Sequence, residues 1–337
     1  MLRMEIFIWR RRQKEISKKG TIKIMKKTIP FGRAICYSGY REGQSPKTNI
    51  PSLAEIKEDL EILVNDGYRY IRMYDPNLHA ERVLQIISEE ELPLKCIVGI
   101  DSDPEENNPN CPFEEQNYSE EELKKHAIRN DDQIEELITL VKKYSDLVIA
   151  VSVGNENTPH WGAHRVSEER LIRHARRLKE ELTQPVTFCE GYYEWESLND
   201  LAEELDIISV HSYPYHYGTK IEEAVAQNRS QYKDIQEMYP EHQVIITELG
   251  WSTDSTEDSH QAIIRDEIKE ISFDPNGPKR ASVENAKYYL QELNKWIEDE
   301  QVIVFYFEAF DELWKGSSEK SSECNFGIYN NDRVRKY

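Results

Sequence analysis

The feature that most constrains this chain is the alternation of short runs rich in Val and Ile with longer stretches of helical periodicity. Eight such runs occur, at residues 33–37, 70–74, 94–100, 147–153, 186–189, 207–211, 244–247 and 302–307. Each run is almost continuously apolar, which is typical of parallel strands covered by helices on both faces. Repeated strand–helix units of this kind indicate an α/β protein with a parallel sheet.

The stretches between the runs have the apolar spacing of amphipathic helices. Residues 53–64 carry Leu, Ile and Val at helical spacing, directly after Ser52 and Glu55, which have the spacing of a capping box. Ser119 and Glu122 repeat that spacing. Further helices are expected at about 78–90, 167–182, 194–205, 221–239 and 282–299.

Eight strands in alternation with about eight helices predict a single (β/α)8 TIM barrel, which we place at residues 29–337. No segment rich in Pro, Gly or Ser divides this region. The alternative is a doubly wound open sheet. That fold is disfavoured as a dinucleotide-binding protein because no G-x-G-x-x-G motif follows the first run.

The first 28 residues differ from the rest of the chain. The opening MLRMEIFIW is too short and too charged for the apolar core of a secretory signal, and the basic segment RRRQKEISKK follows it. We expect residues 1–28 to be a poorly ordered basic leader, with Met25 as another candidate start. The compartment is unknown: a start at Met1 favours the cytoplasm, and a different start allows an extracellular or periplasmic protein. No stretch has the roughly 18 to 20 apolar residues of a membrane span.

Composition limits the partners. The chain has 43 basic and 63 acidic residues and a formal net charge of −20. Nucleic acids and anionic membranes select clustered Lys and Arg, so we expect neither as a partner. Five cysteines without a C-x-x-C pair indicate neither a disulfide framework nor a zinc site, and the acidic loop at 101–118 lacks EF-hand spacing. We therefore expect a neutral substrate and neither metal nor cofactor. We also expect a monomer.

Polar residues follow several of the runs, at the positions where barrel side chains enter an active site. Glu156 follows the fourth run in GNEN, and Glu248 follows the seventh in TELGWS. A lone glutamate after a strand is usually a solvated loop residue, but these two face each other across the barrel mouth. Glycosidic cleavage needs such a pair, one carboxyl group that donates a proton to the leaving oxygen and one carboxylate that attacks the anomeric carbon or activates water.

Taken together and in this order, the motifs resemble glycoside hydrolase family 17, the β-1,3-glucanases and related transglucosylases of clan A. The similar segments, which extend over nearly the whole chain after the leader, are AICY at 34–37, IRMY at 71–74, VGNE at 153–156, YPY at 213–215, TELGWS at 247–252 and an E-x-x-K…E-x-x-F-G pattern at 312–327. Residues 305–315 look more like the bacterial and fungal members. Ser252 departs from the plant-type proline.

The resemblance implies retaining chemistry on β-1,3-glucan, with Glu156 as acid/base and Glu248 as nucleophile. It further implies that Glu312, Lys315 and Glu323 form a charged cluster beside the site. The residues expected to bind substrate, by resemblance or by their position after a strand, are Tyr37, Asn155, His211, Tyr213, Trp251, Glu308, Glu312, Lys315 and Glu323.

Three functions are compatible with these residues. The first is an endo-acting β-1,3-glucan hydrolase of laminarinase type, which works by double displacement through a covalent glucosyl-enzyme. The second is a β-1,3-glucan transglucosylase that uses the same two carboxylates. The third, a non-catalytic glucan-binding barrel, is disfavoured because both carboxylates are present. Long loops at 101–118 and 251–278 are expected to wall an open cleft, and a retaining mechanism predicts carboxyl groups about 5 to 5.5 Å apart.

Overall fold

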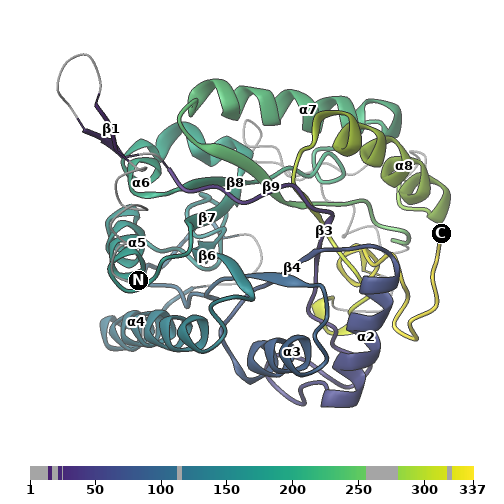
Figure 1. Cartoon of the computed structure of the whole chain (residues 1–337), viewed down its shortest axis with the longest axis horizontal. Coiled ribbons are helices and arrows are strands. Elements are labelled where there is room, and N and C mark those ends of the chain that lie inside the picture. The colour runs from purple at the N-terminus through teal and green to yellow at the C-terminus, as the bar shows by residue number, and fades with distance from the viewer. Residues whose placement is uncertain (1–13, 17–21, 25, 112–115, 256–279, 317–320) are drawn as a thin grey trace, which may run out of the picture.

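A closed barrel of eight parallel strands forms the body of the computed structural model, which describes the chain except residues 1–13, 17–21, 25, 112–115, 256–279 and 317–320 (Figure 1). The strand order is β10-β3-β4-β5-β6-β7-β8-β9. The bounds are β3 (Ala34–Cys36), β4 (Tyr70–Met73), β5 (Lys95–Val98), β6 (Val148–Asn155), β7 (Val186–Gly191), β8 (Ile207–His211), β9 (Gln243–Leu249) and β10 (Val304–Tyr306). The predicted single (β/α)8 barrel is confirmed.

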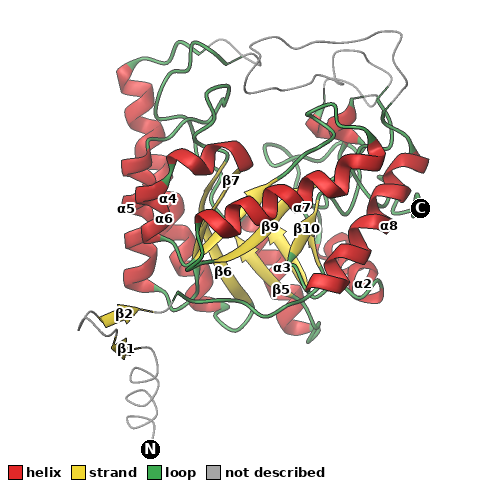
Figure 2. Ribbon diagram, turned by 90° about the horizontal axis from the view of Figure 1, so that it is seen from above, coloured by secondary structure: helices red, strands yellow, loops and turns green. Residues whose placement is uncertain are grey.

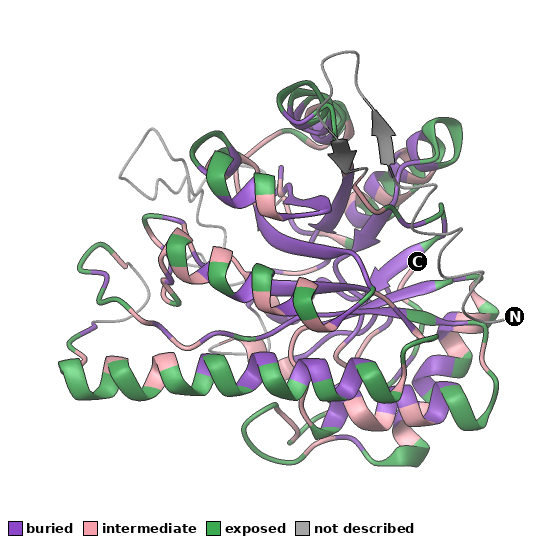
Figure 3. Ribbon diagram, turned by 60° about the vertical axis from the view of Figure 1, so that its left-hand side comes forward, coloured by how far each residue is buried: buried purple, intermediate pink, exposed green. Residues whose placement is uncertain are grey.

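Helices surround the barrel and bury one face each against it (Figure 3). Their bounds are α2 (Leu53–Asn65), α3 (Leu78–Glu89), α4 (Glu120–Lys143), α5 (Glu168–Glu181), α6 (Asn199–Glu204), α7 (Ile221–Met238) and α8 (Val283–Glu300). Both predicted capping boxes are present. In the first, the Ser52 hydroxyl accepts from the Glu55 N–H at 3.3 Å, and the Glu55 carboxylate accepts from the Ser52 N–H at 2.7 Å.

Three strands are longer than the sequence predicted, and the extra residues lead into the barrel mouth. Strands β6, β7 and β9 were expected to end at residues 153, 189 and 247, but they continue to Asn155, Gly191 and Leu249. Asn155 still pairs with Cys189, and His211 pairs with Glu248. The polar residues at the strand ends interrupt the apolar pattern, whereas the backbone pairing continues through them.

The helix predicted at 194–205 is instead two elements, the 3-10 helix η1 (Tyr192–Ser197) and α6. Trp195 explains the break. Its ring is fully buried against Phe188 and Tyr239, with centroid distances of 6.1 and 5.9 Å, and its indole N–H donates to the Ser209 carbonyl at 3.2 Å. Anchoring this ring under β8 holds the backbone in a tighter turn, so tertiary packing overrides helical periodicity here.

The predicted leader at 1–28 falls mostly outside the described residues. Its described part includes β1 (Lys14–Ile16) and β2 (Ile22–Ile24), an antiparallel pair that lies outside the ring of helices (Figure 2). Beyond it, Ile29 exchanges two hydrogen bonds of 2.8 Å with the side chain of Gln243, at the start of β9. Within the described ranges, no helix has the length and apolar character needed to cross a membrane.

A buried ion pair ties the end of the chain to α2. The carboxylate of Asp59 is fully buried and accepts from Arg333 Nε at 2.7 Å and from Nη2 at 2.8 Å. The same carboxylate accepts from the Tyr37 hydroxyl at 3.2 Å. Because Tyr37 follows β3, the contacts of Asp59 with Arg333 and Tyr37 connect the helical shell, the first barrel strand and the C-terminal segment.

We expect Arg333→Met to lower the free energy of unfolding by about 2 to 3 kcal/mol, because the buried carboxylate of Asp59 would keep only the partly exposed Arg41, at 3.2 Å, as its cation. The matched control is Arg335→Met. Arg335 pairs with Asp66 at 3.0 Å on the surface, and its side chain is 50% exposed. Its loss should cost less than about 1 kcal/mol. Urea unfolding of both variants tests this, and equal losses would contradict the role assigned to Arg333.

Candidate active site

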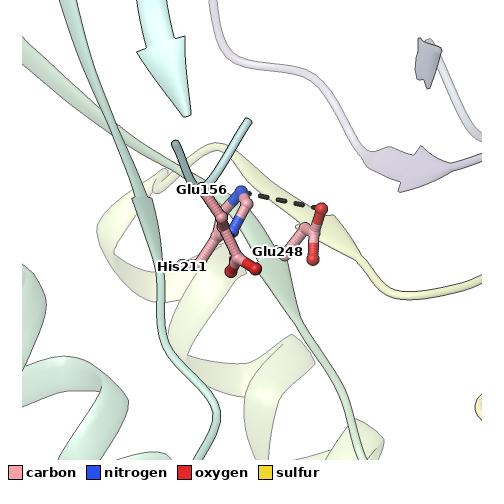
Figure 4. Close-up of side chains that lie close together, drawn as sticks. All are labelled: Glu156, His211 and Glu248. Atoms are coloured by element: carbon pink, nitrogen blue, oxygen red, sulfur yellow. Dashed lines mark hydrogen bonds and ion pairs between the residues drawn. The ribbon is translucent and has the colours of Figure 1, made fainter. Parts of the chain in front are cut away.

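The two predicted glutamates meet at the carboxyl ends of their strands. Glu156 directly follows β6, Glu248 lies near the end of β9, and His211 ends β8 between them (Figure 4). One ligand atom from each of the three side chains lies within 4.8 Å of the others. The barrel therefore brings together one carboxyl oxygen from each glutamate, although the two residues are far apart in the sequence.

The GNEN segment forms a tight turn that directs Glu156. Glu156 has φ +48°, in the left-handed region, which costs about 1 to 3 kcal/mol and persists only where contacts impose it. Three hydrogen bonds do so: Glu156 N–H to the Cys189 carbonyl at 2.9 Å, Asn155 N–H to Asn157 Oδ1 at 2.9 Å, and Asn157 Nδ2 to the His164 carbonyl at 2.7 Å. A Cβ on Gly154 would lie 2.1 Å from Asn157 Oδ1, so only glycine leaves room for that amide.

Glu248 is held as a carboxylate. It is 6% exposed, Arg72 Nη1 donates to its Oε1, and the Tyr213 hydroxyl donates to its Oε2 at 2.7 Å. Burial alone would raise the pKa of Glu248, but His211, Arg72 and the Tyr213 hydrogen bond lower this pKa to about 2. The same guanidinium donates from Nη2 to Asn155 Oδ1, so Arg72 orients residues on both sides of the barrel mouth.

His211 contacts both glutamates (Figure 4). Its Nδ1 lies 2.7 Å from Glu156 Oε1, and its Nε2 lies 3.6 Å from Glu248 Oε1. Burial would lower the pKa of His211, but Glu248, Cys189 and Glu156 raise it to about 10. A raised pKa favours the protonated imidazole at neutral pH.

Two residues of the site were missed by the sequence analysis. Glu190, near the end of β7, is fully buried and accepts from the N–H and the hydroxyl of Thr158 at 3.1 and 2.9 Å. Burial and the nearby charge of Glu156 raise the pKa of Glu190 to about 8. Arg72 was seen only as part of a motif. The sequence did contain a signal for both residues. Glu190 and Arg72 are charged residues within otherwise apolar strands, and a buried charge requires a partner.

Lys315 pairs with Glu308 and Glu312, whereas the expected charged cluster was Glu312, Lys315 and Glu323. Lys315 Nζ contacts Glu308 Oε2 and lies 2.7 Å from Glu312 Oε2, and Glu312 Oε1 accepts from the Tyr40 N–H at 3.0 Å. Burial lowers the pKa of Lys315, but both glutamates raise it above its usual range. Glu323 Oε1 lies 3.7 Å from His216 Nε2, and the Glu323 side chain is 43% exposed. Burial and Arg280 lower the pKa of His216 to about 4, so this contact is not an ion pair at neutral pH.

A cavity of about 470 Å³ opens beside Glu248. Five of the expected site residues belong to its lining, namely Tyr37, Asn155, Glu248, Lys315 and Glu323. Tyr40 and Trp314 add an aromatic wall, with ring centroids 5.9 Å apart and Trp314 41% exposed. Of the two central glutamates, only Glu248 is part of this lining among the described residues.

Comparison with known proteins identifies the family. Residues 34–327 match the model of the BtgE/BtgC glycoside hydrolase domain. The chain belongs to this family. The match contains every barrel strand together with Glu156, His211 and Glu248, so the site described above is that of a glycoside hydrolase domain. A comparison with curated protein sequences found no match.

Solved structures share the barrel at low sequence identity. An endo-laminarinase from Formosa Hel1_33_131 superposes with a TM-score of 0.72 at 22% identity, over 89% of this chain and 83% of that chain. A glycoside hydrolase family 17 β-1,3-glucanosyltransferase from Rhizomucor miehei has a TM-score of 0.66 at 20% identity, over 90% and 94%. A β-glucuronidase from Ruminococcus gnavus has a TM-score of 0.63 at 17% identity, over 91% and 48%. These likenesses show the fold that the glycoside hydrolase domain adopts.

Trp251 does not lie where it was expected. Its ring is fully buried between Tyr215 and Tyr289, with centroid distances of 5.3 and 5.6 Å, and its indole N–H donates to the Arg280 carbonyl at 3.0 Å. Trp251 lies two residues beyond the end of β9, where the chain turns toward α8 and its residue Tyr289. Trp251 therefore packs behind the site instead of lining its cavity.

The expected loop walls are described only in part. Most of the loop at 251–278 lies outside the described residues. In the loop at 101–118, which is described except for residues 112–115, Asp101 joins the cavity lining. Glu105 of the same loop pairs with Arg170, whose Nε donates at 2.7 Å and Nη2 at 2.9 Å.

The cluster of Glu156, His211 and Glu248 has the size of a metal site, but its donors suit a different role. Both oxygens of Glu248 already accept hydrogen bonds, from Arg72 and Tyr213. The guanidinium of Arg72 also places a permanent positive charge where a cation would bind. These groups fit an ion-paired carboxylate, and we assign no metal or cofactor to the glycoside hydrolase domain.

Gly154→Ala should lower the glycosidase activity by roughly 10²-fold, because the new methyl group displaces Asn157 and with it the turn that directs Glu156. Gly191→Ala is the matched control, since a Cβ there meets no atom within 4 Å. Both variants should melt cooperatively with the barrel intact. Full activity in Gly154→Ala, measured at saturating substrate, would show that the turn is not required.

Proposed function

We propose that this protein is a retaining endo-β-1,3-glucan hydrolase of laminarinase type, within glycoside hydrolase family 17. The observation that carries the proposal is the approach of Glu156 and Glu248, whose nearest ligand oxygens lie within 4.8 Å. Retaining enzymes hold their carboxyl groups about 5 to 5.5 Å apart, whereas inverting enzymes leave about 6.5 to 9.5 Å for a water molecule. The observed spacing supports retention.

The environments of the two glutamates suit different steps. Glu248, whose pKa is lowered by His211, Arg72 and the Tyr213 hydrogen bond, attacks the anomeric carbon and forms the glucosyl-enzyme, while Glu156 protonates the leaving oxygen. In the second step Glu156 takes a proton from water, which displaces Glu248. Asn155 has its amide oxygen fixed by Arg72, so its Nδ2 can donate to the sugar 2-hydroxyl, a contact that strengthens in the transition state.

The cavity suggests how a glucan chain lies. Glu248 is in the cavity lining, so the sugar whose anomeric carbon is attacked occupies the cavity, beside Tyr40 and Trp314. The leaving part of the chain then extends past Glu156, over the ends of β7 and β8. Tyr193 and Tyr217 follow those strands with ring centroids 5.3 Å apart, and Tyr193 is 46% exposed. Aromatic faces of this kind can pack on pyranose rings.

The names of two structural neighbours and the net charge of this protein support a neutral β-1,3-glucan as substrate. The endo-laminarinase and the β-1,3-glucanosyltransferase that share this barrel are named for action on such glucans. The net charge of −20 repels anionic polymers. A second candidate is a β-1,3-glucan transglucosylase, since the tyrosines beyond Glu156 could equally hold a sugar acceptor in place of water.

Glu248→Ala should lose activity by about 10⁴-fold or more if this residue is the nucleophile. Azide should then restore turnover with an α-glucosyl azide product, because the anion fits the vacated space. Glu156→Ala should instead keep its first step on substrates with good leaving groups and give a β-glucosyl azide. Glu237→Ala, on the exposed face of α7, is the control. Undiminished turnover by Glu248→Ala would exclude it as the nucleophile.

Laminarin should be cut to short oligosaccharides whose new reducing ends are initially β, as followed by proton NMR, while cellulose stays intact. Initial release of α-anomers would refute retention. Glucose as the sole early product would refute the endo mode. Products longer than the substrate would identify the transglucosylase, and the absence of any product would leave a glucan-binding barrel.

A further inference from the structure

His211 contacts both members of the proposed catalytic pair, a position that cleavage by two carboxyl groups does not require. The ring is 2% exposed and lies between the two glutamates (Figure 4). Its contact with Glu156 Oε1, at 2.7 Å, has the length of a strong hydrogen bond. Its Nε2 makes no hydrogen bond in the described part of the chain and lies 3.6 Å from Glu248 Oε1.

A proton must lie on the short contact, because a bare imidazole nitrogen and a carboxylate oxygen are both acceptors. It can belong to Nδ1, with an ionised Glu156 and a ring that is charged because Nε2 also holds a proton. It can instead belong to Glu156, with a neutral ring that keeps the proton on Nε2. Both forms hold the same number of protons and differ by one transfer along the hydrogen bond. The second form is the one that the first catalytic step needs, with Glu156 protonated and Glu248 ionised.

We propose that His211 stores the proton that Glu156 delivers to the glycosidic oxygen, so that the acid of this enzyme is the Glu156–His211 pair instead of a lone carboxyl group. The inference rests on the proposed role of Glu156 as acid/base. His211 acts through Glu156 and is therefore a positioning residue.

The surroundings of the ring favour a stored proton. Burial lowers the pKa of His211, but the negative charge of Glu248, the thiol of Cys189 and the contact with Glu156 raise it to about 10. Glu190 has a pKa raised to about 8 by burial and by Glu156, so it is mostly neutral at neutral pH and adds little charge. The titratable and charged groups that face the pair include Arg72 on β4, Glu156 after β6, Cys189 and Glu190 on β7, Tyr213 and His216 after β8, and Glu248 on β9.

The proton balance closes over one catalytic cycle. In the first half, the proton passes from Nδ1 to Glu156 and on to the glycosidic oxygen, as the bond to the anomeric carbon breaks and Glu248 forms the ester. Neither Nδ1 nor Glu156 then holds a proton, so their hydrogen bond is absent until the second half restores it. In the second half, Glu156 removes a proton from the water that attacks the anomeric carbon, and the ester bond to Glu248 breaks. The proton then returns to the contact between Glu156 and His211.

The proposal is tested by the pH profile of kcat/KM on laminarin, in its alkaline limb, where activity falls as the pH rises. A stored proton is present below the raised pKa and is lost as the pH rises, so the wild-type limb should extend beyond that of a lone carboxyl group. In His211→Asn the limb should move down by about one pH unit or more. At the wild-type optimum kcat should fall by roughly 10²-fold, with KM changed by less than about threefold.

Two comparisons separate proton storage from a structural role. His242→Asn, the same change at a histidine bonded to the Ala202 carbonyl below the barrel, should leave the limb in place. On a dinitrophenyl β-laminaribioside, whose leaving group needs no proton, the first step of His211→Asn should match the wild type. The proposal would be overturned if the alkaline limb of His211→Asn coincided with that of the wild type. It would also be overturned if His211→Asn slowed the first step on the dinitrophenyl substrate as much as it slows turnover of laminarin.

A readout on the free enzyme keeps this inference distinct from the glucanase assignment. The imidazole ¹⁵N resonances of His211 should titrate with a midpoint well above that of an ordinary histidine. In Glu156→Gln the midpoint should fall by about one pH unit or more. An unchanged midpoint would overturn the proton pair. A shifted midpoint in a wild type that is inactive on laminarin would instead refute the proposed function alone.

Discussion

The ion pair between Arg72 and Glu248 is the interaction on which the rest of the site depends. Arg72 is 2% exposed and leaves β4 toward the barrel mouth, where its guanidinium donates to Glu248 on β9 and to Asn155 on β6. Removing one partner of a buried pair costs about 3 to 5 kcal/mol, since the other charge is left without compensation. One side chain therefore joins three strands and fixes Glu248 relative to the Asn155 amide beside Glu156.

Charge balance explains how several glutamates can occupy one barrel mouth. Like charges at this spacing repel, so each needs a cation nearby or must hold a proton. Arg72 and His211 supply positive charge beside Glu248, which stays ionised. Glu190, fully buried and near Glu156, tends to keep its proton. Chemically identical carboxyl groups thus acquire different protonation states, which is the property that allows them to play different roles.

The end of the chain completes the site that earlier strands begin. Beyond β10, Glu308 and Lys315 come to the site, Lys315 lines the cavity, and Arg333 then returns to Asp59 on α2. Tyr37 donates to that same carboxylate, so the first barrel strand and the last segment share one buried acceptor. This closure explains why the cavity is lined by residues from both ends of the sequence.

The sequence by itself determined the fold class, the eight strands, the capped helices and the two glutamates that face each other. These follow from local periodicity and from which strand a residue ends, and both are encoded within a few neighbouring positions. Only the tertiary structure decided the direction of Trp251, the break at Trp195 and the partners of Glu190 and Arg72. Those outcomes depend on register between strands and on burial. The double contact of His211 depends on the spacing of three strands, which no local pattern encodes.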